Sequence, residues 1–328
     1  MKKRIKYLNF IGLLLFAVIL YKIDYGQIVK YLRDADYRYL FLAYPLILIN
    51  IFLKAVRWNL LMRSQGTRIP VLETFYVYLW AFYFGTVTPG RIGEVSKAIY
   101  FQDRFDNIGR SFVSVFVDRA YDVGIRLALL FILYPLYSNL FDFNYIGFLL
   151  LFIIAISGIV LLIKMKSIRN IVAKFSKFVL PKKYYPVISK NISGFVNDTV
   201  MMITGVKPVA KSVLLTLPSF LCYCLVAFLI LKSFSIEMDF TYIIFCLVVS
   251  SFSVMVPISI SGLGVREAVM IYLFSSIGLG KEAAVLFSLS IFMLSPVLGL
   301  HGWIINLVMM VGSRFKKAEE EIEISDAD

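Results

Sequence analysis

The segment Thr88-Pro89-Gly90-Arg91-Ile92-Gly93-Glu94 interrupts an apolar run that extends from Val71 to Tyr100. Non-helical backbone at membrane depth leaves N–H and C=O groups unpaired, which is tolerable only where protein or a water-filled cavity satisfies them. Glycine allows backbone conformations that are closed to other residues, and proline ends a helix without leaving an N–H unpaired. We therefore interpret this run as a re-entrant hairpin, in which the chain enters the membrane and returns to the same side.

The C-terminal half contains a second interrupted run, from Phe240 to Leu279. The interruption reads Pro257-Ile258-Ser259-Ile260-Ser261-Gly262-Leu263-Gly264-Val265-Arg266-Glu267. Like the first interruption, it contains two closely spaced glycines followed by an acidic residue. A helix that begins after such a turn points its positive end inward, which suits a phosphate or another anion. The predicted hairpin backbones depend on Pro89, Gly90, Gly93, Gly262 and Gly264. The alternative is a pair of ordinary surface loops with solvated charges at Arg91, Glu94, Lys97, Arg266 and Glu267.

The composition places the whole chain in a membrane. Among its 328 residues, 60% are hydrophobic and 17% are charged, and the mean hydropathy is +0.81. Soluble domains carry about 45–50% apolar and about 25% charged residues, so this chain cannot hide its apolar surface in a soluble globule. Three scattered cysteines exclude a disulfide scaffold, a zinc ribbon and a thioredoxin-type motif. The predicted fold class is an all-α polytopic membrane protein.

Run lengths and basic residues together predict the topology. A helix needs about 20 mostly apolar residues to span the hydrocarbon layer. The runs that qualify are Leu8 to Tyr21, Tyr39 to Leu61, Phe112 to Leu136, Tyr145 to Ile163, Val213 to Leu231 and Ala283 to Val311. Positive charge marks the cytoplasmic side, and much of the net charge of +13 lies between Lys164 and Lys211. We expect about six full spans and two oppositely directed hairpins, about eight membrane segments in all, with both termini in the cytoplasm and no nucleic-acid partner.

Helix, hairpin and helix then occur twice in opposite orientation, so the sequence predicts an inverted repeat, an arrangement typical of transporters. We expect one integral membrane domain over 1–328. Its predicted parts are an N-terminal helix with an amphipathic segment over 1–38, a first repeat over 39–136, a basic cytoplasmic connector over 164–211, a second, inverted repeat over 212–313, and a charged tail over 314–328.

Charged side chains also lie inside one predicted span. Arg119, Asp122 and Arg126 share a face of the helix that begins near Phe112, and Asp118 neighbours Asp122 one turn away. Charges inside a membrane helix are costly unless they are paired or hydrated, so these should face a cavity or the protein interior. The arginines suit a lipid phosphate, and the alternatives are a closed structural network or the cytoplasmic end of the helix with Arg126 snorkelling. Lys54 and Arg57 near the end of the second span either snorkel to the cytoplasm or, for Arg57, join this group.

Four of these features together resemble a known family. They are Arg57-Trp58, the segment from Thr88 to Glu94, the helix containing Asp118-Arg119, and the segment from Ser261 to Glu267. The combination resembles the lysylphosphatidylglycerol synthase transmembrane family, also called the flippase-like family, over nearly the whole chain. Its members are bacterial and archaeal membrane proteins, and multi-domain members add a soluble aminoacyl-transferase domain. This chain ends soon after its last predicted span, so the resemblance is to stand-alone members, and lysyl transfer is not carried over.

The resemblance and the residues together predict a lipid translocator rather than an enzyme. Its cargo would be an anionic phospholipid or a polyprenyl-phosphate-linked headgroup, and it would need no cofactor or metal. Arg91 and Arg266 would contact phosphate, Glu94 and Glu267 would balance them, and the face from Asp118 to Arg126 would line the path. No ATPase motif is present, so movement would be downhill or coupled to an ion gradient. We expect a prokaryotic cell membrane as its location.

Two other functions stay open from the sequence. Asp34 and Asp36 lie in the first outside loop, where paired acids suit a divalent cation in a glycosyltransferase that uses a lipid-linked donor. Alternatively, the basic stretch from Lys164 to Lys211 would dock a lipid-modifying enzyme or anionic lipid, with this chain as a non-catalytic partner. His301 is the only histidine, and we interpret it as a packing residue rather than a ligand or proton relay.

Overall fold

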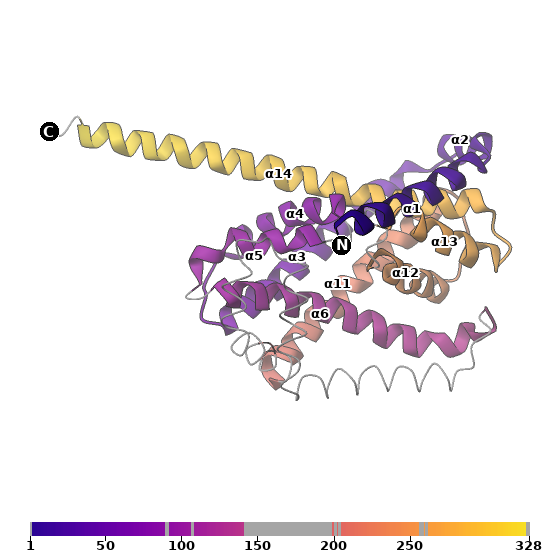
Figure 1. The fold of residues 1–328 in the computed structure, drawn as a ribbon, viewed down its shortest axis with the longest axis horizontal. Helices are drawn as coiled ribbons and strands as arrows, with labels where there is room; N and C mark the ends of the chain where they lie inside the picture. The colour runs from indigo at the N-terminus through magenta and orange to yellow at the C-terminus, as the bar shows by residue number, and fades with distance from the viewer. Residues whose placement is uncertain are drawn as a thin grey trace.

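The computed structural model describes residues 2–88, 92–105, 108–140, 199, 202, 205–255, 259 and 262–325. Within these residues every regular element is a helix (Figure 1). The N-terminal half comprises α1 (Lys2–Tyr21), α2 (Tyr25–Arg33), α3 (Tyr37–Ser64), α4 (Val71–Val87), η1 (Ile92–Val95), α5 (Ser96–Tyr100), η2 (Gln102–Arg104), α6 (Ile108–Leu133) and η3 (Tyr134–Leu140). The C-terminal half comprises α11 (Val206–Ser233), α12 (Phe240–Met255), α13 (Val265–Ser275) and α14 (Lys281–Ser325). The protein is therefore an all-α polytopic membrane protein.

Among the described residues, four helices are long and apolar enough to cross a membrane by themselves. They are Tyr37–Ser64, Gly109–Leu140, Val209–Ser233 and Lys281–Ile304, and each coincides with a predicted span. The first predicted span belongs to a bent pair, because α1 turns by 82° into α2, and this pair makes a fifth candidate. The predicted span from Tyr145 to Ile163 lies outside the described residues, so the count of six full spans stays a prediction.

The first helices of the two halves, α3 and α11, pack along each other in opposite directions. At one end, the backbone N–H of Asp36 donates to the carbonyl of Ser233 at 2.9 Å. At mid-length, the Asn50 side-chain amide donates to the carbonyl of Ser219 at 2.5 Å and to its hydroxyl at 3.2 Å. The start of α3 thus lies beside the end of α11. Two equivalent helices can run antiparallel in this way only if their repeats have opposite orientation in the membrane.

Other helices also pack across the boundary between the two halves. α4 packs on α14, and α12 packs on α6, so each half contributes its broken helix to the last helix of the other (Figure 1). Small residues allow a close approach of α14 to α4: a Cβ on Gly299 would lie 2.3 Å from the Cβ of Tyr83, and one on Gly302 would lie 2.5 Å from the backbone nitrogen of Trp80. Each half thus packs against the other through two helix pairs, and the inverted repeat stays a prediction.

The described helices on either side of each interruption pack against each other, α4 against η1 and α5 in the first half and α12 against α13 in the second. After α4, the hydroxyl of Thr88 accepts a hydrogen bond from the backbone N–H of Gly93 at 2.7 Å. A Cβ on Gly93 would lie 2.1 Å from the carbonyl oxygen of Phe84, so only glycine fits there. Pro89, Gly90 and Arg91 lie outside the described residues. The predicted need for glycine is therefore explained in the first hairpin by a close backbone approach.

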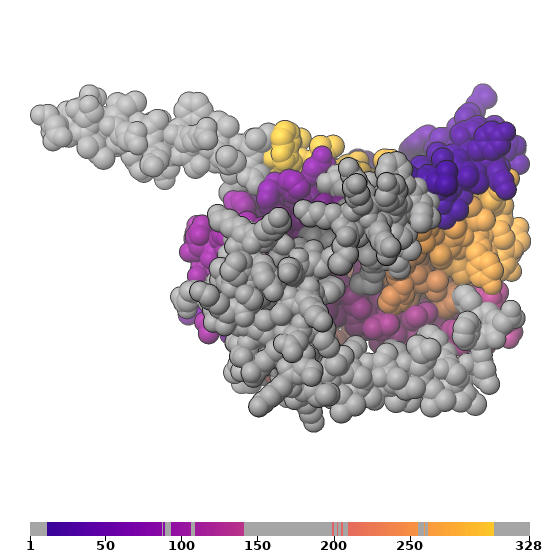
Figure 2. All heavy atoms as spheres, in the orientation of Figure 1, coloured from indigo at the N-terminus to yellow at the C-terminus, as the bar shows by residue number. Residues whose placement is uncertain are grey.

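The second hairpin needs glycine for its backbone conformation as well. Gly262 and Gly264 have φ of +80° and +86°, a region that L side chains rarely adopt. A Cβ on Gly264 would also lie 2.1 Å from the carbonyl oxygen of Gly12 on α1. Figure 2 shows the indigo N-terminal helices lying against the orange surface of the C-terminal half, where α1 contacts α13. Helix α1 therefore braces the second hairpin from outside the repeat.

Candidate functional site

A cavity of about 120 Å³ lies between the two halves and is lined by helices from both of them. Its charged lining residues are Lys54, Arg119, Asp122, Arg126 and Arg266, so four cations and one acid face it. Serine, threonine and asparagine side chains line it as well, among them Asn50, Ser219 and Ser250. A polar cavity at membrane depth with an excess of cations suits an anionic group.

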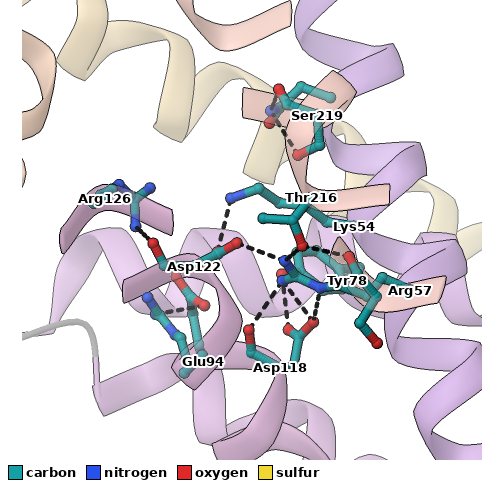
Figure 3. A network of polar contacts seen from close by, with 12 residues as sticks. Lys54, Arg57, Tyr78, Glu94, Asp118, Asp122, Arg126, Thr216 and Ser219 are labelled. Carbon is teal, nitrogen blue, oxygen red and sulfur yellow. Dashed lines mark hydrogen bonds and ion pairs between the residues drawn. The ribbon is translucent and has the colours of Figure 1, made fainter. Parts of the chain in front are cut away.

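Arg57 is fully buried and joins three helices behind the cavity (Figure 3). Its Nε donates to Oδ1 of Asp118 at 2.9 Å, and its Nη2 donates to the backbone carbonyl of Asp118 at 3.0 Å. Its Nη1 donates to Oδ1 of Asp122 and to the hydroxyl of Thr216, both at 2.8 Å. The sequence allows Arg57 either to snorkel to the cytoplasm or to join the charged helix, and in the structure Arg57 contacts that helix, α6. Because it is sealed behind the cavity, it holds the two aspartates rather than contacting the contents of the cavity.

Lys97 fastens the first hairpin to the same aspartate. Its Nζ lies 2.7 Å from Oδ2 of Asp118, and the hydroxyl of Tyr78 donates to this oxygen at 3.0 Å. The ammonium also lies over two aromatic rings, at 3.9 Å from the ring centroid of Tyr78 and 4.9 Å from that of Trp58. Cations gain from such placement over a ring face. Asp118 thus accepts from α3, α4 and α5 at once and forms a closed structural network rather than part of the cavity wall.

Asp122 is the point where this network meets the cavity. Its Oδ1 binds Arg57, and its Oδ2 accepts from Nζ of Lys54 at 2.9 Å. The backbone carbonyl of the same residue accepts from Nη1 of Arg126 at 3.1 Å. Figure 3 shows the three cationic side chains converging on Asp122. Lys54 therefore reaches inward to the cavity, and the predicted snorkelling of Lys54 is wrong.

The first hairpin contributes one carboxylate to the edge of this site. Glu94 is buried and forms an ion pair with Arg119, which lines the cavity. A Cβ on Gly85 would lie 2.6 Å from the Cγ of Glu94, so the small residue makes room for the acid. Glu94 is a partner of the lining arginine and does not itself line the cavity.

The second hairpin reproduces this arrangement within its own turn. The carboxylate of Glu267 accepts from the backbone N–H of Gly264 at 2.6 Å, which caps α13. Its other oxygen accepts from Nη2 of Arg266 at 2.5 Å and from the hydroxyl of Ser288 on α14 at 2.8 Å. Arg266 lines the cavity and also donates through Nε to Ser288 at 2.7 Å. Glu267 supports Arg266 from behind, as Glu94 supports Arg119.

The interpretation of both interruptions as solvated surface loops is wrong for the charges that the structure describes. Lys97 and Glu267 are fully buried, and Glu94 and Arg266 are 5% and 6% exposed. Arg91, the other predicted phosphate contact, lies outside the described residues. The structure therefore brings Arg266 together with Arg119, Asp122 and Arg126 at one cavity.

Sequence reasoning missed several members of this site. Lys54, Lys97, Tyr78 and Thr216 were not among the predicted site residues. For Lys54 the sequence contains a signal, because Lys54 and Arg57 are three residues apart and share one face of an apolar helix. Arg119 and Asp122 have the same spacing. Tyr78 and Thr216 carry no such signal, because tyrosine and threonine are common in membrane helices for other reasons.

The paired acids near α2 have a local structural role. The side chain of Asp36 accepts from the backbone N–H of Arg38 at 3.0 Å and so caps the start of α3. The backbone N–H of Asp34 closes the end of α2 through a hydrogen bond to the carbonyl of Lys30 at 2.9 Å. Asp36 is therefore engaged as a helix cap. The basic stretch from Lys164 to Lys211, which would serve a docking function, lies largely outside the described residues.

His301 contacts two helices. Its Nδ1–H donates to the carbonyl of Val297 at 2.7 Å on its own helix, so Nε2 is the acceptor for the hydroxyl of Tyr44 at 3.1 Å. The two rings lie 5.8 Å apart between centroids. The side chain of His301 is exposed, so it links α14 to α3 through hydrogen bonds at the surface and is not packed in the interior as predicted.

A second hollow of about 500 Å³ lies where α11 ends and α12 begins, lined by Lys232, Glu237 and Asp239 among others. Its two acidic residues do not form a cation-binding site, because the carboxylate of Asp239 already caps the start of α12. Hydrogen bonds from Thr241 and from the backbone N–H of Tyr242 hold the pKa of Asp239 below its usual value. The smaller cavity between the halves is thus the better candidate site.

Known proteins resemble this chain over most of its length. Residues 8–300 match the family model described as the lysylphosphatidylglycerol synthase TM region. The UPF0104 membrane protein PH1989 of Pyrococcus horikoshii is 24% identical over 84% of this chain and 88% of its own length. The UPF0104 membrane protein MJ1595 of Methanocaldococcus jannaschii is 27% identical over 84% of this chain and 85% of its own length. No solved structure is a significant match. The chain belongs to the lysylphosphatidylglycerol synthase TM-region family.

Proposed function

We propose that this protein moves a lipid with an anionic phosphate group between the leaflets of a prokaryotic cell membrane and does not change the lipid chemically. The observation that carries this proposal is the polar cavity between two oppositely oriented halves, with four cations and one acid in its lining. In inverted-repeat transporters the substrate binds at the interface of the repeats, near the midplane, beside broken helices. Here the cavity lies between the two halves, and its lining includes Arg266 of the second hairpin and Arg119, the ion-pair partner of Glu94 in the first hairpin.

The charge balance supports an anionic cargo. In the described part of the chain, the charged residues of the cavity lining and the network of ion pairs that continues from them contain six cations and four carboxylates. The cations are Lys54, Arg57, Lys97, Arg119, Arg126 and Arg266, and the carboxylates are Glu94, Asp118, Asp122 and Glu267. Uncompensated charge in a low-dielectric interior is costly. An incoming phosphate would remove this cost, which favours its transfer from the leaflet into the cavity.

The interlocked halves supply a route for alternating access. Helices α3 and α11 form an antiparallel pair along their length, and each half reaches across to the other through α4 and α12. Rocking of one half against the other about this pair would open the cavity to one leaflet and then to the other. With both termini in the cytoplasm, the two hairpins would face opposite leaflets. Movement would be downhill or driven by an ion gradient, because the sequence has no ATPase motif.

A lipid-scrambling assay tests this function. The purified protein is placed in liposomes with fluorescent phosphatidylglycerol or phosphatidylcholine, and the fraction reached by a membrane-impermeant quencher is followed. We expect protein-dependent movement that is faster for phosphatidylglycerol, and slower in Arg266→Gln than in the unaltered protein. Absence of movement for both lipids, or equal movement in Arg266→Gln, would contradict the proposal.

A further inference from the structure

Arg126 differs from the other cations that line the cavity. Its Nη1 bonds to the backbone carbonyl of Asp122, and its Nε is buried with no hydrogen-bond partner. No ion pair of Arg126 is found among the described residues, whereas Lys54, Arg119 and Arg266 each have a carboxylate within 4.0 Å. A buried unsatisfied donor on a charged group is costly. Arg126 is therefore the lining residue with unused hydrogen-bonding capacity.

Lys54 is the second cation with capacity for a ligand. Its only carboxylate partner in the described structure is Asp122, and that carboxylate is shared with the fully buried Arg57. An ammonium has three donor hydrogens, so one bond to Asp122 leaves others directed at the cavity. Lys54 and Arg126 converge on Asp122 from different helices, α3 and α6. Together Lys54 and Arg126 form a two-cation binding site, here called the seat, that shares the single acid Asp122.

The charge of the cavity restricts what these two cations can hold. The excess of two positive charges described above matches a phosphomonoester, whose charge at neutral pH is about −1.5 to −2. A phosphodiester headgroup carries a single negative charge and would leave the excess incompletely balanced.

We propose that the cargo is a lipid with a terminal phosphate, a phosphomonoester, and that Lys54 and Arg126 are the residues that select it over phosphodiester lipids. This rests on the proposed function in one respect, that a lipid phosphate reaches the cavity. Arg126 offers its free Nε–H and the outer Nη2 to two phosphate oxygens, a bidentate geometry that suits guanidinium. Lys54 turns from Asp122 to a third oxygen, and Arg57 keeps the carboxylate of Asp122 in place.

The test compares phosphatidic acid with phosphatidylglycerol of the same acyl chains, because the two differ at the headgroup alone. Translocation is measured in proteoliposomes, and lipid retention is measured separately by native mass spectrometry of the detergent-solubilised protein. We expect the unaltered protein to prefer phosphatidic acid by about tenfold, which corresponds to about 1.4 kcal/mol. Arg126→Gln and Lys54→Gln should each lower this ratio, and the double variant should bring it close to one.

Lys232→Gln is the matched control, because it removes the same charge from an exposed position on α11, where the ammonium lies over the ring of Phe228 outside the cavity. Its ratio should equal that of the unaltered protein. Inorganic phosphate and diphosphate are added as competitors to separate the source of the ligand. Displacement of phosphatidic acid by an equal concentration of soluble anion would identify the free anion as the natural ligand, and resistance to displacement supports a lipid.

The two readouts separate this inference from the proposed function. Equal translocation and equal retention of the two lipids would overturn the selectivity for a terminal phosphate, while leaving lipid movement intact. Selective retention of phosphatidic acid that depends on Arg126, without any translocation, would support the seat and overturn the transport function. An unchanged ratio in the double variant that still folds, as judged by monodisperse elution, would show that Lys54 and Arg126 do not select the lipid.

Discussion

Arg57 on α3 and Thr216 on α11 are joined by a hydrogen bond of 2.8 Å between Nη1 and the threonine hydroxyl. Through this bond the charged network of the first half contacts the first helix of the second half. The same guanidinium nitrogen donates to Asp122, which lies at the edge of the cavity. Arg57 thus couples the packing of the two halves to the position of the one acid in the lining of the cavity.

Replacing Arg57 by methionine should destabilise the protein strongly. The change leaves the buried carboxylates of Asp118 and Asp122 without their shared partner, and breaking a buried ion pair costs about 3–5 kcal/mol. Thr216→Val removes the hydrogen bond from Arg57 and the threonine's own bond to the carbonyl of Ser212 but leaves Arg57 paired with both aspartates, so it should cost less, about 1.5–3 kcal/mol. Thermal unfolding in detergent, followed by loss of monodisperse protein, measures both. A Tm for Arg57→Met equal to that of Thr216→Val would show that the network is not structural.

The antiparallel pairing of α3 with α11 predicts a specific disulfide. Asp36 and Ser233 share a backbone hydrogen bond, so cysteines at these two positions should cross-link under mild oxidation. The control pairs Asp36→Cys with Ser212→Cys, which lies 21 residues earlier on the same helix and so about 30 Å away. Gel mobility before and after reduction detects the bond. Cross-linking of the control pair and not of the first would mean that the two helices run in the same direction.

The second hairpin should tolerate no side chain at Gly264. Gly264→Ala adds a Cβ at 2.1 Å from the carbonyl of Gly12 and forces alanine into a φ of +86°. Gly278→Ala is the matched control, because Gly278 has a similar φ of +80° with open space around it. The control should lose about 1–2 kcal/mol, the cost of the left-handed conformation alone. Gly264→Ala should lose considerably more, as measured by Tm, and equal losses would show that α1 does not brace the hairpin.

Much of the architecture is predictable from the sequence, because membrane depth imposes few choices. An apolar run of sufficient length forms a helix. Two close glycines inside such a run, such as Gly262 and Gly264, indicate that a turn interrupts the helix at a place where protein or water satisfies the backbone. The same cost argument predicts that Asp118, Arg119, Asp122 and Arg126 turn away from lipid. These inferences depend on local sequence and on the bilayer, and not on which helices are neighbours.

The partners of these charges depend on tertiary packing, and the sequence does not contain that information in a local form. Lys97 reaches Asp118 because the first hairpin folds back onto α6, a contact between residues that are 21 positions apart. Lys54 lies near the end of an apolar helix, where snorkelling and inward pairing are equally compatible with the pattern. The neighbouring Asp122 decides between them. Likewise, Arg126 is identified as the underused cation only by comparing the bonds of all the lining residues.

In the proposed function, the cations of the cavity between the halves carry the lipid phosphate across the membrane. The most direct measurement is the rate of phosphatidic acid translocation in proteoliposomes for the double variant Lys54→Gln/Arg126→Gln. Its control is Lys22→Gln/Lys232→Gln, which removes two positive charges from exposed positions. We predict that the cavity variant moves phosphatidic acid only at about the rate at which the unaltered protein moves phosphatidylglycerol, while the control keeps the phosphatidic acid rate of the unaltered protein. A folded cavity variant that moves phosphatidic acid as fast as the control would contradict the account.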